Sequence, residues 1–488
     1  MRKLLSIQQR RMLDIIEFLY SSDHFFIYEL SDHFKCSPKT IRNDIHIIND
    51  FFYPVEIVTH QSKGISLQLP SNYSIEFVYE VILENSLEFT LLELIFFKKN
   101  LTVSKAADKL HSSPSTIRRL ISKMNEALKD ECISIHTFPI KMIGNEADIC
   151  NFYVHLITEK YSSRKKPFSS LQLKALDQAL LILAEKEKVS LNFPDIEKLR
   201  IWIMVNIVRM QNDPTGNIVF SSLNEEKATE IVNSLTPTHK ITFKMIFRLE
   251  LDVQVISRLF YVFLVKQFAF DATTFDVILN GDSNAAKIVS MFDEIITNTA
   301  IEFDIPLLNK KEILLNLYNV SILQYGQPFI LYDKCRFFIE SIEMKNPEFT
   351  DFLKRQYMDV FNQPKLMHYE LYSYLYFTIT HWQNLPRFLD RASPKLRVVL
   401  FFNTDIEHME FIKNEIALRF QEKLVVQLVN DISLSTFKKN VPLYDIILTN
   451  ISGIQNDLNN VLCFSINPKT NDWTNVYKLY LKIAFPAK

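Results

Sequence analysis

The sequence predicts a mainly α-helical protein of several domains: two N-terminal winged helix-turn-helix domains, two helical bundles and a C-terminal α/β domain. Three observations lead to this fold class. The chain has 488 residues, which at roughly 100 to 200 residues per domain accommodates about three to five domains. A segment near the N-terminus recurs further along the chain, and a long helical middle gives way to alternating strands and helices after Pro394. We therefore expect domains at residues 1–70, 71–166, 167–282, 283–392 and 393–488.

The composition excludes several classes of enzyme. Glycine accounts for only 6 of 488 residues, far below the usual share of about 7%, and the six never cluster. Walker A and GxGxxG loops need neighbouring glycines so that the backbone can approach phosphate. The five cysteines are widely spaced and form no CxxC pair, which disfavours a disulfide framework and a structural zinc site. We therefore expect no cofactor, no metal and no catalytic residue.

Charge and hydropathy limit the partners. The formal net charge is -1 at pH 7, so any nucleic-acid surface must be a local patch. Apolar runs such as Phe260 to Val265 end at Lys266, well short of the ~20 residues that a membrane span needs. The N-terminus also lacks the pattern of a signal peptide. We expect a cytoplasmic protein that has no membrane partner.

The first two domains are predicted from an internal repeat. At an offset of 76 residues, Ile27 to Asn49 aligns with Val103 to Asn125. In each copy a short helix ends in a polar break, and a Ser-Pro pair then opens a second helix, with Ser suited to the cap and Pro to the first turn. This order is typical of a helix-turn-helix. The identities are Asp32/Asp108, Ser37/Ser113, Pro38/Pro114, Thr40/Thr116, Ile41/Ile117, Arg42/Arg118, Ile45/Ile121 and Asn49/Asn125.

Each second helix is predicted to have an apolar face and a polar face. Apolar side chains recur at a spacing of three to four residues, so these faces should pack inward. They are Ile41, Ile45, Ile48 and Phe52 in the first copy and Ile117, Ile121, Met124 and Leu128 in the second. The opposite faces carry hydroxyls, an amide and cations, which suit phosphates and base edges. The residues predicted to contact DNA are Lys39, Thr40, Arg42, Asn43, His46, Ser115, Thr116, Arg118, Arg119, Ser122 and Lys123.

Short β-prone pairs follow each second helix and are predicted to be wings. They are Val55–Val58 with Ile65–Leu69, and Ile133–Ile135 with Ile140–Ile143. From Lys98 to Lys123 the second copy has seven cations against a single acid, Asp108, so it carries the stronger field for an anionic backbone. A basic helical face alone is usually just solvated. A duplicated helix-turn-helix with wings favours binding to duplex DNA.

The middle of the chain, from about Phe168 to Asp390, is helical in period and rich in Phe and Tyr. Breaks near 212–216, 281–283 and 325–328 leave two bundles of roughly 110 residues each, which fits the usual domain scale. We interpret the aromatic residues as core rather than as a cofactor box. The histidines of this region are His239, His368 and His381.

After Pro394 strands alternate with helices, which predicts a small α/β sheet. The expected strands are Leu396–Asn403, Lys423–Asn430, Tyr444–Leu448 and Val461–Ile466, with helices at Asp405–Phe420 and at about Asp472–Ile483. In such a sheet a ligand or nucleophile would sit in the loop after the first strand. That loop, Asn403 to Ile406, has no Cys and no Gly.

This order of parts, with SPxTIR in both winged helices, resembles the Mga/AtxA family of global virulence regulators from Gram-positive bacteria. The resemblance covers the whole chain. It implies that the two bundles are PTS regulation domains (PRDs), which phosphocarrier proteins of the sugar phosphotransferase system phosphorylate on histidine. It also implies that the last domain is similar to a phosphotransferase EIIB module and supports formation of a homodimer.

Carried over residue by residue, the chain departs from this pattern at two places. The second bundle has Thr378 where an antiterminator-type PRD has the histidine of YLxxHF, with His381 one turn further on, and the first bundle leaves only His239. Asn403 or Thr404 stands where an active EIIB needs its cysteine, so the last domain should be unable to accept phosphate. His381, ranked ahead of His239, is the predicted regulatory phosphorylation site.

The sequence therefore predicts a transcriptional regulator, not an enzyme, whose partners are double-stranded DNA, a second copy of the chain and phosphocarrier proteins. One alternative is a phosphotransfer protein that passes phosphate onward through His239 or His381 and has no direct role at DNA. Stable rather than transient labelling by the phosphocarrier would separate these two functions. Another alternative is a scaffold, which a lack of salt-sensitive binding to duplex DNA would favour.

Overall fold

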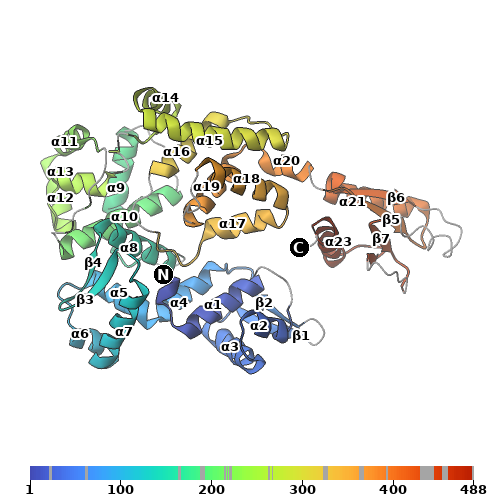
Figure 1. Ribbon diagram of the computed structural model, residues 1–488, viewed down its shortest axis with the longest axis horizontal. Coiled ribbons are helices and arrows are strands. Elements are labelled where there is room, and N and C mark those ends of the chain that lie inside the picture. The colour runs from blue at the N-terminus through green and yellow to red at the C-terminus, as the bar shows by residue number, and fades with distance from the viewer. Residues whose placement is uncertain are drawn as a thin grey trace. The chain divides into compact units, whose positions relative to one another are not determined.

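The computed structural model of this chain is mainly helical (Figure 1). It divides into two compact units, Met1–Ile278 with Ser321–Asp333 and Leu279–Val320 with Lys334–Lys488. The structure describes residues 1–20, 25–60, 64–162, 166–186, 193–213, 216, 218, 223–261, 264–265, 267–322, 328–361, 368–391, 394–428, 444–452 and 460–485.

The first winged helix consists of three helices and a hairpin. Its elements are α1 (Ile7–Tyr20), α2 (Ile27–His33), α3 (Pro38–Phe51), β1 (Glu56–His60) and β2 (Gly64–Gln68). Strands β1 and β2 pair antiparallel and form the predicted wing. On the apolar face of α3, Ile41 and Ile48 are buried together with Phe52, and Ile45 is half-buried. The N–H of Val55 closes a turn onto the carbonyl of Phe52 just before β1 begins at Glu56.

The second winged helix repeats this plan between two flanking helices. Its elements are α5 (Leu87–Phe97), α6 (Val103–Lys109), α7 (Pro114–Ala127), β3 (Ile133–Thr137) and β4 (Ile140–Gly144), preceded by α4 (Glu76–Asn85) and followed by α8 (Glu146–Lys160). The strands again form an antiparallel hairpin. The four apolar side chains predicted for α7, Ile117, Ile121, Met124 and Leu128, are all buried.

The first helical bundle shares one continuous core with both winged helices. Its helices are α9 (Ser170–Lys186), α10 (Phe193–Asn212), α11 (Glu225–Ser234), α12 (Pro237–Phe247), α13 (Val253–Leu259) and α14 (Ala272–Gly281). Helix α8 packs against α10 and against α4, so it joins the bundle to the winged-helix segment. The first unit is therefore held together by apolar packing and not only by linkers.

The second unit contains another helical bundle. Its helices are α15 (Ser283–Glu302), α16 (Lys310–Ile322), α17 (Lys334–Glu343), α18 (Pro347–Val360), α19 (His368–His381) and α20 (Leu385–Arg391). Asp282 caps α15 by accepting hydrogen bonds from the N–H groups of Asn284 and Ala285. The core is aromatic, as expected. The rings of Tyr357 and Tyr374, for example, are stacked with centroids 5.8 Å apart.

Between α16 and α17 the chain returns to the first unit, where residues 328–333 pack against α8. The ring centroid of Phe329 lies 5.2 Å from that of Phe152, and Leu331 is buried. The Glu159 carboxylate accepts a hydrogen bond from the N–H of Leu331 at 3.1 Å. We call residues 328–333 the strap.

The C-terminal part of the second unit is an α/β domain with a parallel four-stranded sheet in the order β6-β5-β7-β8. Its elements are β5 (Leu396–Phe401), α21 (Ile406–Phe420), β6 (Leu424–Leu428), β7 (Ile446–Thr449), β8 (Val461–Cys463) and α23 (Thr470–Ala484). One face of the sheet packs on the apolar sides of α21 and α23. The last predicted strand is shorter than expected, ending at Cys463 rather than Ile466.

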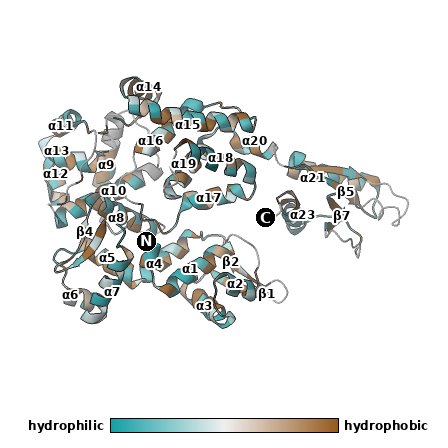
Figure 2. Cartoon of the chain, viewed as in Figure 1, coloured by the Kyte–Doolittle hydropathy of each residue, from teal (hydrophilic) through white to brown (hydrophobic). Residues whose placement is uncertain are grey.

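Hydropathy is distributed as in amphipathic helices. Figure 2 shows brown and teal side by side along most of the helices, which is the pattern of elements that bury one face and expose the other. Within the described residues, no helix has both the length and the apolar stretch required to cross a bilayer.

Candidate nucleic-acid interface

The two recognition helices, α3 and α7, begin with the same cap. Ser37 Oγ accepts a hydrogen bond from the N–H of Thr40 at 3.1 Å, and Ser113 Oγ accepts one from the N–H of Thr116 at 3.1 Å. Proline occupies the first turn in both helices. The cap satisfies one of the N–H groups that the first turn leaves without a helical partner. The Ser-Pro pair therefore determines where each helix starts, as predicted.

On α3, four of the five predicted DNA-contacting side chains are exposed: Lys39, Arg42, Asn43 and His46. The ring of His46 lies with Nδ1 3.0 Å from a carboxylate oxygen of Asp50. The fifth residue, Thr40, is half-buried, and its hydroxyl lies 2.9 Å from that of Ser37. Thr40 thus belongs to the cap as much as to the exposed face.

On α7, the exposed predicted residues are Ser115, Arg118, Arg119, Ser122 and Lys123. The hydroxyls of Ser115 and Thr116 lie 2.7 and 2.8 Å from Ser113 Oγ, so the cap holds both of them. Lys123 Nζ is 4.0 Å from Glu88, which reduces its effective charge. Among the described residues, neither arginine has an acidic partner. The two guanidinium groups are the strongest phosphate ligands that this helix offers.

An asparagine clamp fixes each wing to its recognition helix. The side chain of Asn125 donates to the carbonyl of Ile135 at 2.9 Å and accepts from its N–H at 2.7 Å. Asn49 makes the same two bonds to Ile57, at 3.0 and 2.7 Å. These asparagines appear among the identities of the repeat, but their role as clamps was not evident from the sequence. Wing and recognition helix therefore present a preformed surface.

A partly buried ion pair supports α3 from behind and was missed by the sequence reasoning. Asp44 is 1% exposed and accepts hydrogen bonds from Arg11 Nε at 2.6 Å and Nη2 at 3.0 Å. The hydrogen bond to Asp44 raises the pKa of Arg11. The equivalent position in α7 is Leu120. The two recognition helices are thus anchored differently, one by a charge pair and the other by apolar packing.

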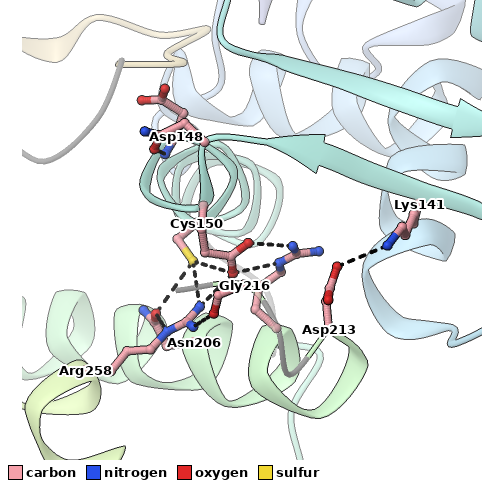
Figure 3. A network of polar contacts seen from close by, with 10 residues as sticks. Lys141, Asp148, Cys150, Asn206, Asp213, Gly216 and Arg258 are labelled. Carbon is pink, nitrogen blue, oxygen red and sulfur yellow. Dashed lines mark hydrogen bonds and ion pairs between the residues drawn. The ribbon is translucent and has the colours of Figure 1, made fainter. Parts of the chain in front are cut away.

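A second buried network joins α8 to the first bundle. Figure 3 shows part of this network, with Cys150, Asn206 and Arg258 drawn close to one another. Arg209 of α10 donates to Glu146 from Nε at 3.1 Å and from Nη2 at 2.6 Å. Arg258 of α13 donates to the same carboxylate from Nη2 at 2.6 Å. All three side chains are buried, so a single carboxylate accepts hydrogen bonds from two guanidinium groups in a region shielded from water.

Neutral groups complete this network. Arg258 also donates to the side-chain oxygen of Asn206 at 2.8 Å and to the carbonyl of Gly216 at 2.7 Å. A Cβ at Gly216 would lie 2.8 Å from a carboxylate oxygen of Glu146, so glycine suits this position. Burial raises the pKa of the Cys150 thiol to about 12. This cysteine therefore stays protonated and serves as packing and as a weak hydrogen-bond donor.

The histidines of the two bundles lie in different environments. His239 is exposed in the first turn of α12, where its N–H donates to Thr236 Oγ1 at 3.2 Å. His381 is half-buried at the end of α19, with its Nδ1 3.0 Å from the carbonyl of Phe377. The ring of His381 stacks on that of Phe377 with centroids 5.3 Å apart. The side chain of His368 lies outside the described residues.

Thr378 of α19 is fully buried. Its hydroxyl donates to the carbonyl of Tyr374 at 2.8 Å and accepts from Tyr357, with the two oxygens 2.6 Å apart. Burial raises the pKa of Tyr357, so this tyrosine remains a donor at neutral pH. The position therefore holds a structural hydrogen bond in the core.

The loop after β5 is closed by side-chain hydrogen bonds. The N–H of Asn403 donates to the side-chain oxygen of Asn450, which follows β7, at 2.9 Å. Thr404 Oγ1 lies 3.1 Å from His408 Nδ1, and His408 Nε2 lies 2.9 Å from the carbonyl of Ile466. In a neutral ring, donation to this carbonyl through Nε2 leaves Nδ1 to accept from the threonine hydroxyl. The loop at residues 403–406 therefore carries amide, hydroxyl and carboxylate groups and no thiol.

Comparison with family models assigns the same segments. An HTH domain matches residues 11–66, the Mga helix-turn-helix domain matches residues 71–157, and the M protein trans-acting positive regulator (MGA) PRD domain matches residues 182–385. The first two matches cover the capped helices and wings described above. The third covers most of the first bundle and nearly all of the second.

Proteins similar in sequence to this chain are also named as regulators. A protein of Streptococcus pneumoniae whose name describes a trans-acting regulator is 24% identical over 92% of this chain and 93% of its own length. The capsule synthesis positive regulator AcpA of Bacillus anthracis is 28% identical over 41% of each chain. The anthrax toxin expression trans-acting positive regulator of Bacillus anthracis is 30% identical over 30% of this chain and 31% of its own. The chain belongs to the Mga/AtxA family of transcriptional regulators.

Proposed function

We propose that this Mga-type regulator binds duplex DNA through both recognition helices, with α7 supplying the larger share of the affinity and α3 more of the base reading. The observation that carries the proposal is the pair of arginines, Arg118 and Arg119, exposed on a helix that is capped and clamped to its wing. Guanidinium groups in such a position can form bidentate hydrogen bonds to phosphates. Arg42 and Asn43 of α3 suit guanine and adenine edges.

Replacing Arg118 and Arg119 by alanine is expected to weaken binding and flatten its salt dependence. Each lost phosphate contact removes close to one unit from the slope of log K against log salt, so the double variant should lose about two. The measurement is fluorescence anisotropy with a labelled genomic duplex that the protein retains, from about 50 to 200 mM salt.

Lys174→Ala with Lys198→Ala is the matched control, because it removes the same charge from exposed positions of the first bundle. This control should bind with the slope of the native protein. If the Lys174/Lys198 variant loses as much of the salt-dependence slope as the arginine variant, the effect is due to net charge. An arginine variant that keeps the full slope would remove α7 from the interface.

We assign each domain a part in this function. The winged helices bind DNA, the PRD-like bundles receive a signal, and an EIIB-like domain without a nucleophile joins two copies of the chain in the cytoplasm, where the chromosome lies. The boundaries proposed for these five domains are 1–70, 71–166, 167–282, 283–392 and 393–488.

Among the histidines, His381 is the better candidate for regulatory phosphorylation, ahead of His239. When its Nδ1–H donates to the carbonyl of Phe377, the Nε2 atom carries the lone pair that can attack a phosphoryl donor. Phosphorylation would add about -1.5 to -2 charges at the end of α19. That carboxyl-terminal end of a helix disfavours negative charge, so the modification would destabilise the last turn.

We expect incubation with phosphoenolpyruvate and purified phosphocarrier proteins to place acid-labile phosphate on His381. The label should disappear in the His381→Ala variant and remain in the His239→Ala variant, as read by mass spectrometry at neutral pH. Label that passes onward to a third protein would favour the alternative function of phosphotransfer. Absence of label on both histidines would contradict the proposed input.

The outer face of α21 is the surface we propose for self-association. Phe411 and Leu418 are 60% and 78% exposed and lie two turns apart on one side of this helix. If two copies pack α21 antiparallel about a two-fold axis between Asn414 and Glu415, each Phe411 meets the Leu418 of the second copy. Such a self-complementary pairing is what a symmetric dimer requires.

A further inference from the structure

The tip of the second wing presents an exposed aromatic ring. In the register of the hairpin Thr137 pairs with Ile140, so Phe138 and Pro139 form the whole connection between the strands. The side chain of Phe138 is 84% exposed. A single exposed apolar side chain is common on protein surfaces, so the inference depends on how this ring is held and what surrounds it.

The ring stands on a rigid platform. The N–H of Ile140 donates to the carbonyl of Leu101 at 2.7 Å, which pairs the wing with the segment before α6. The Asn125 clamp holds Ile135, three residues before the ring, to the recognition helix α7. The position of Phe138 relative to α7 is therefore fixed before any ligand binds.

The surroundings of this platform are basic. Lys98 and Lys99 are exposed just before Leu101, and Lys141 is exposed on β4 and pairs with Asp213 at 3.4 Å. An apolar surface of another protein would gain little from these cations. A DNA duplex can bind both the lysines and the aromatic ring, because its phosphates attract the lysines and its base pairs accept the ring between them.

We propose that Phe138 is a wedge that enters the minor groove, partly unstacks one base step and bends the duplex beside the major-groove site of α7. The proposal rests on the DNA binding proposed above. Wedges of this kind bend DNA by roughly 20 to 90°. The tip of the first wing lies outside the described residues, and its sequence Gln61-Ser62-Lys63 is polar, so the wedge belongs to the second domain alone.

The test compares the native protein with Phe138→Ala on a genomic duplex that the native protein retains. Energy transfer between dyes at the two ends reports the bend, and 2-aminopurine placed at successive steps reports unstacking. The native protein should bend the duplex and brighten 2-aminopurine at one step. Phe138→Ala should abolish both signals and weaken binding about tenfold, while the number of phosphate contacts, read from the salt slope, stays unchanged.

Two further variants sharpen the result. Phe138→Leu keeps an apolar wedge and should retain part of the bend. Met245→Ala truncates a side chain of similar exposure, 77%, in the first bundle and should change nothing. The proposal is overturned if the Phe138→Ala protein bends and unstacks the duplex as the native protein does. It is also overturned if the native protein produces no bend and no unstacking, even when the Phe138→Ala protein binds more weakly. Failure of the proposed function is distinct, because then the native protein would bind no duplex at all.

Discussion

Replacing Glu146 by glutamine is expected to lower the local stability of the first unit by about 3 to 5 kcal/mol, the usual effect of removing one partner from a buried charge network. The variant keeps the size of the side chain but leaves Arg209 and Arg258 without an anion in a region shielded from water. Two buried, uncompensated guanidinium groups are far more costly than the loss of two hydrogen bonds.

The measurement is hydrogen exchange of the full-length chain, because the protein has several domains and a single global unfolding curve would not isolate this region. Peptides from α8, α10 and α13 should exchange faster by a factor of about 100 or more, while peptides from the α/β domain should not change. Glu340→Gln is the control, because Glu340 pairs with Arg336 on an exposed helix face at 2.6 Å. Such a pair contributes about 0.5 kcal/mol or less. Unchanged exchange in α8 of the Glu146 variant would show that the network adds no stability.

Replacing Leu418 by glutamate is expected to convert the dimer proposed above to monomer at micromolar concentration. The two-fold packing proposed for α21 buries this side chain twice, once in each copy. Full burial of a leucine contributes about 1.5 to 3 kcal/mol, and the variant also brings a carboxylate into each apolar contact. The dissociation constant should therefore rise at least ~100-fold, since each 1.4 kcal/mol is a factor of ten.

Light scattering over a dilution series measures this change. Leu171→Glu is the matched control, since Leu171 is 63% exposed on α9 and should leave the dimer intact. Truncation after Arg391 should also give monomer. If the Leu418 variant stays dimeric and the truncated chain becomes monomeric, another face of the α/β domain forms the interface. If both stay dimeric, the bundles form it.

The sequence predicts those parts of the site that are determined by residues close to one another in the chain. The Ser-Pro pair specifies the start of each recognition helix through contacts to residues only two or three positions away. The spacing of the apolar residues specifies which face of α7 packs inward. For this reason Arg118 and Arg119 could be predicted as exposed. The β-prone pairs after each second helix also located both wings to within a few residues.

The parts that escaped prediction are pairings between distant segments. Glu146 and Arg258 are 112 residues apart, and nothing in their own neighbourhoods marks them as partners. Asn125 was visible as an identity of the repeat, but its role depends on a main-chain amide ten residues away that only the hairpin brings near. Thr378 marked a departure from the family pattern, whereas its hydrogen bond to Tyr357 depends on the packing of two helices.

The strap has a consequence for synthesis of the protein on the ribosome. The Glu159 carboxylate meets the N–H of Leu331, which lies 172 residues later in the chain. At roughly 5 to 20 residues per second, this partner emerges on the order of ten to thirty seconds after Glu159. The amino-terminal half can build its helices and wings in that interval, but the surface of α8 beneath the strap stays open to water and chaperones. Completion of the DNA-binding unit therefore waits until most of the chain has been translated.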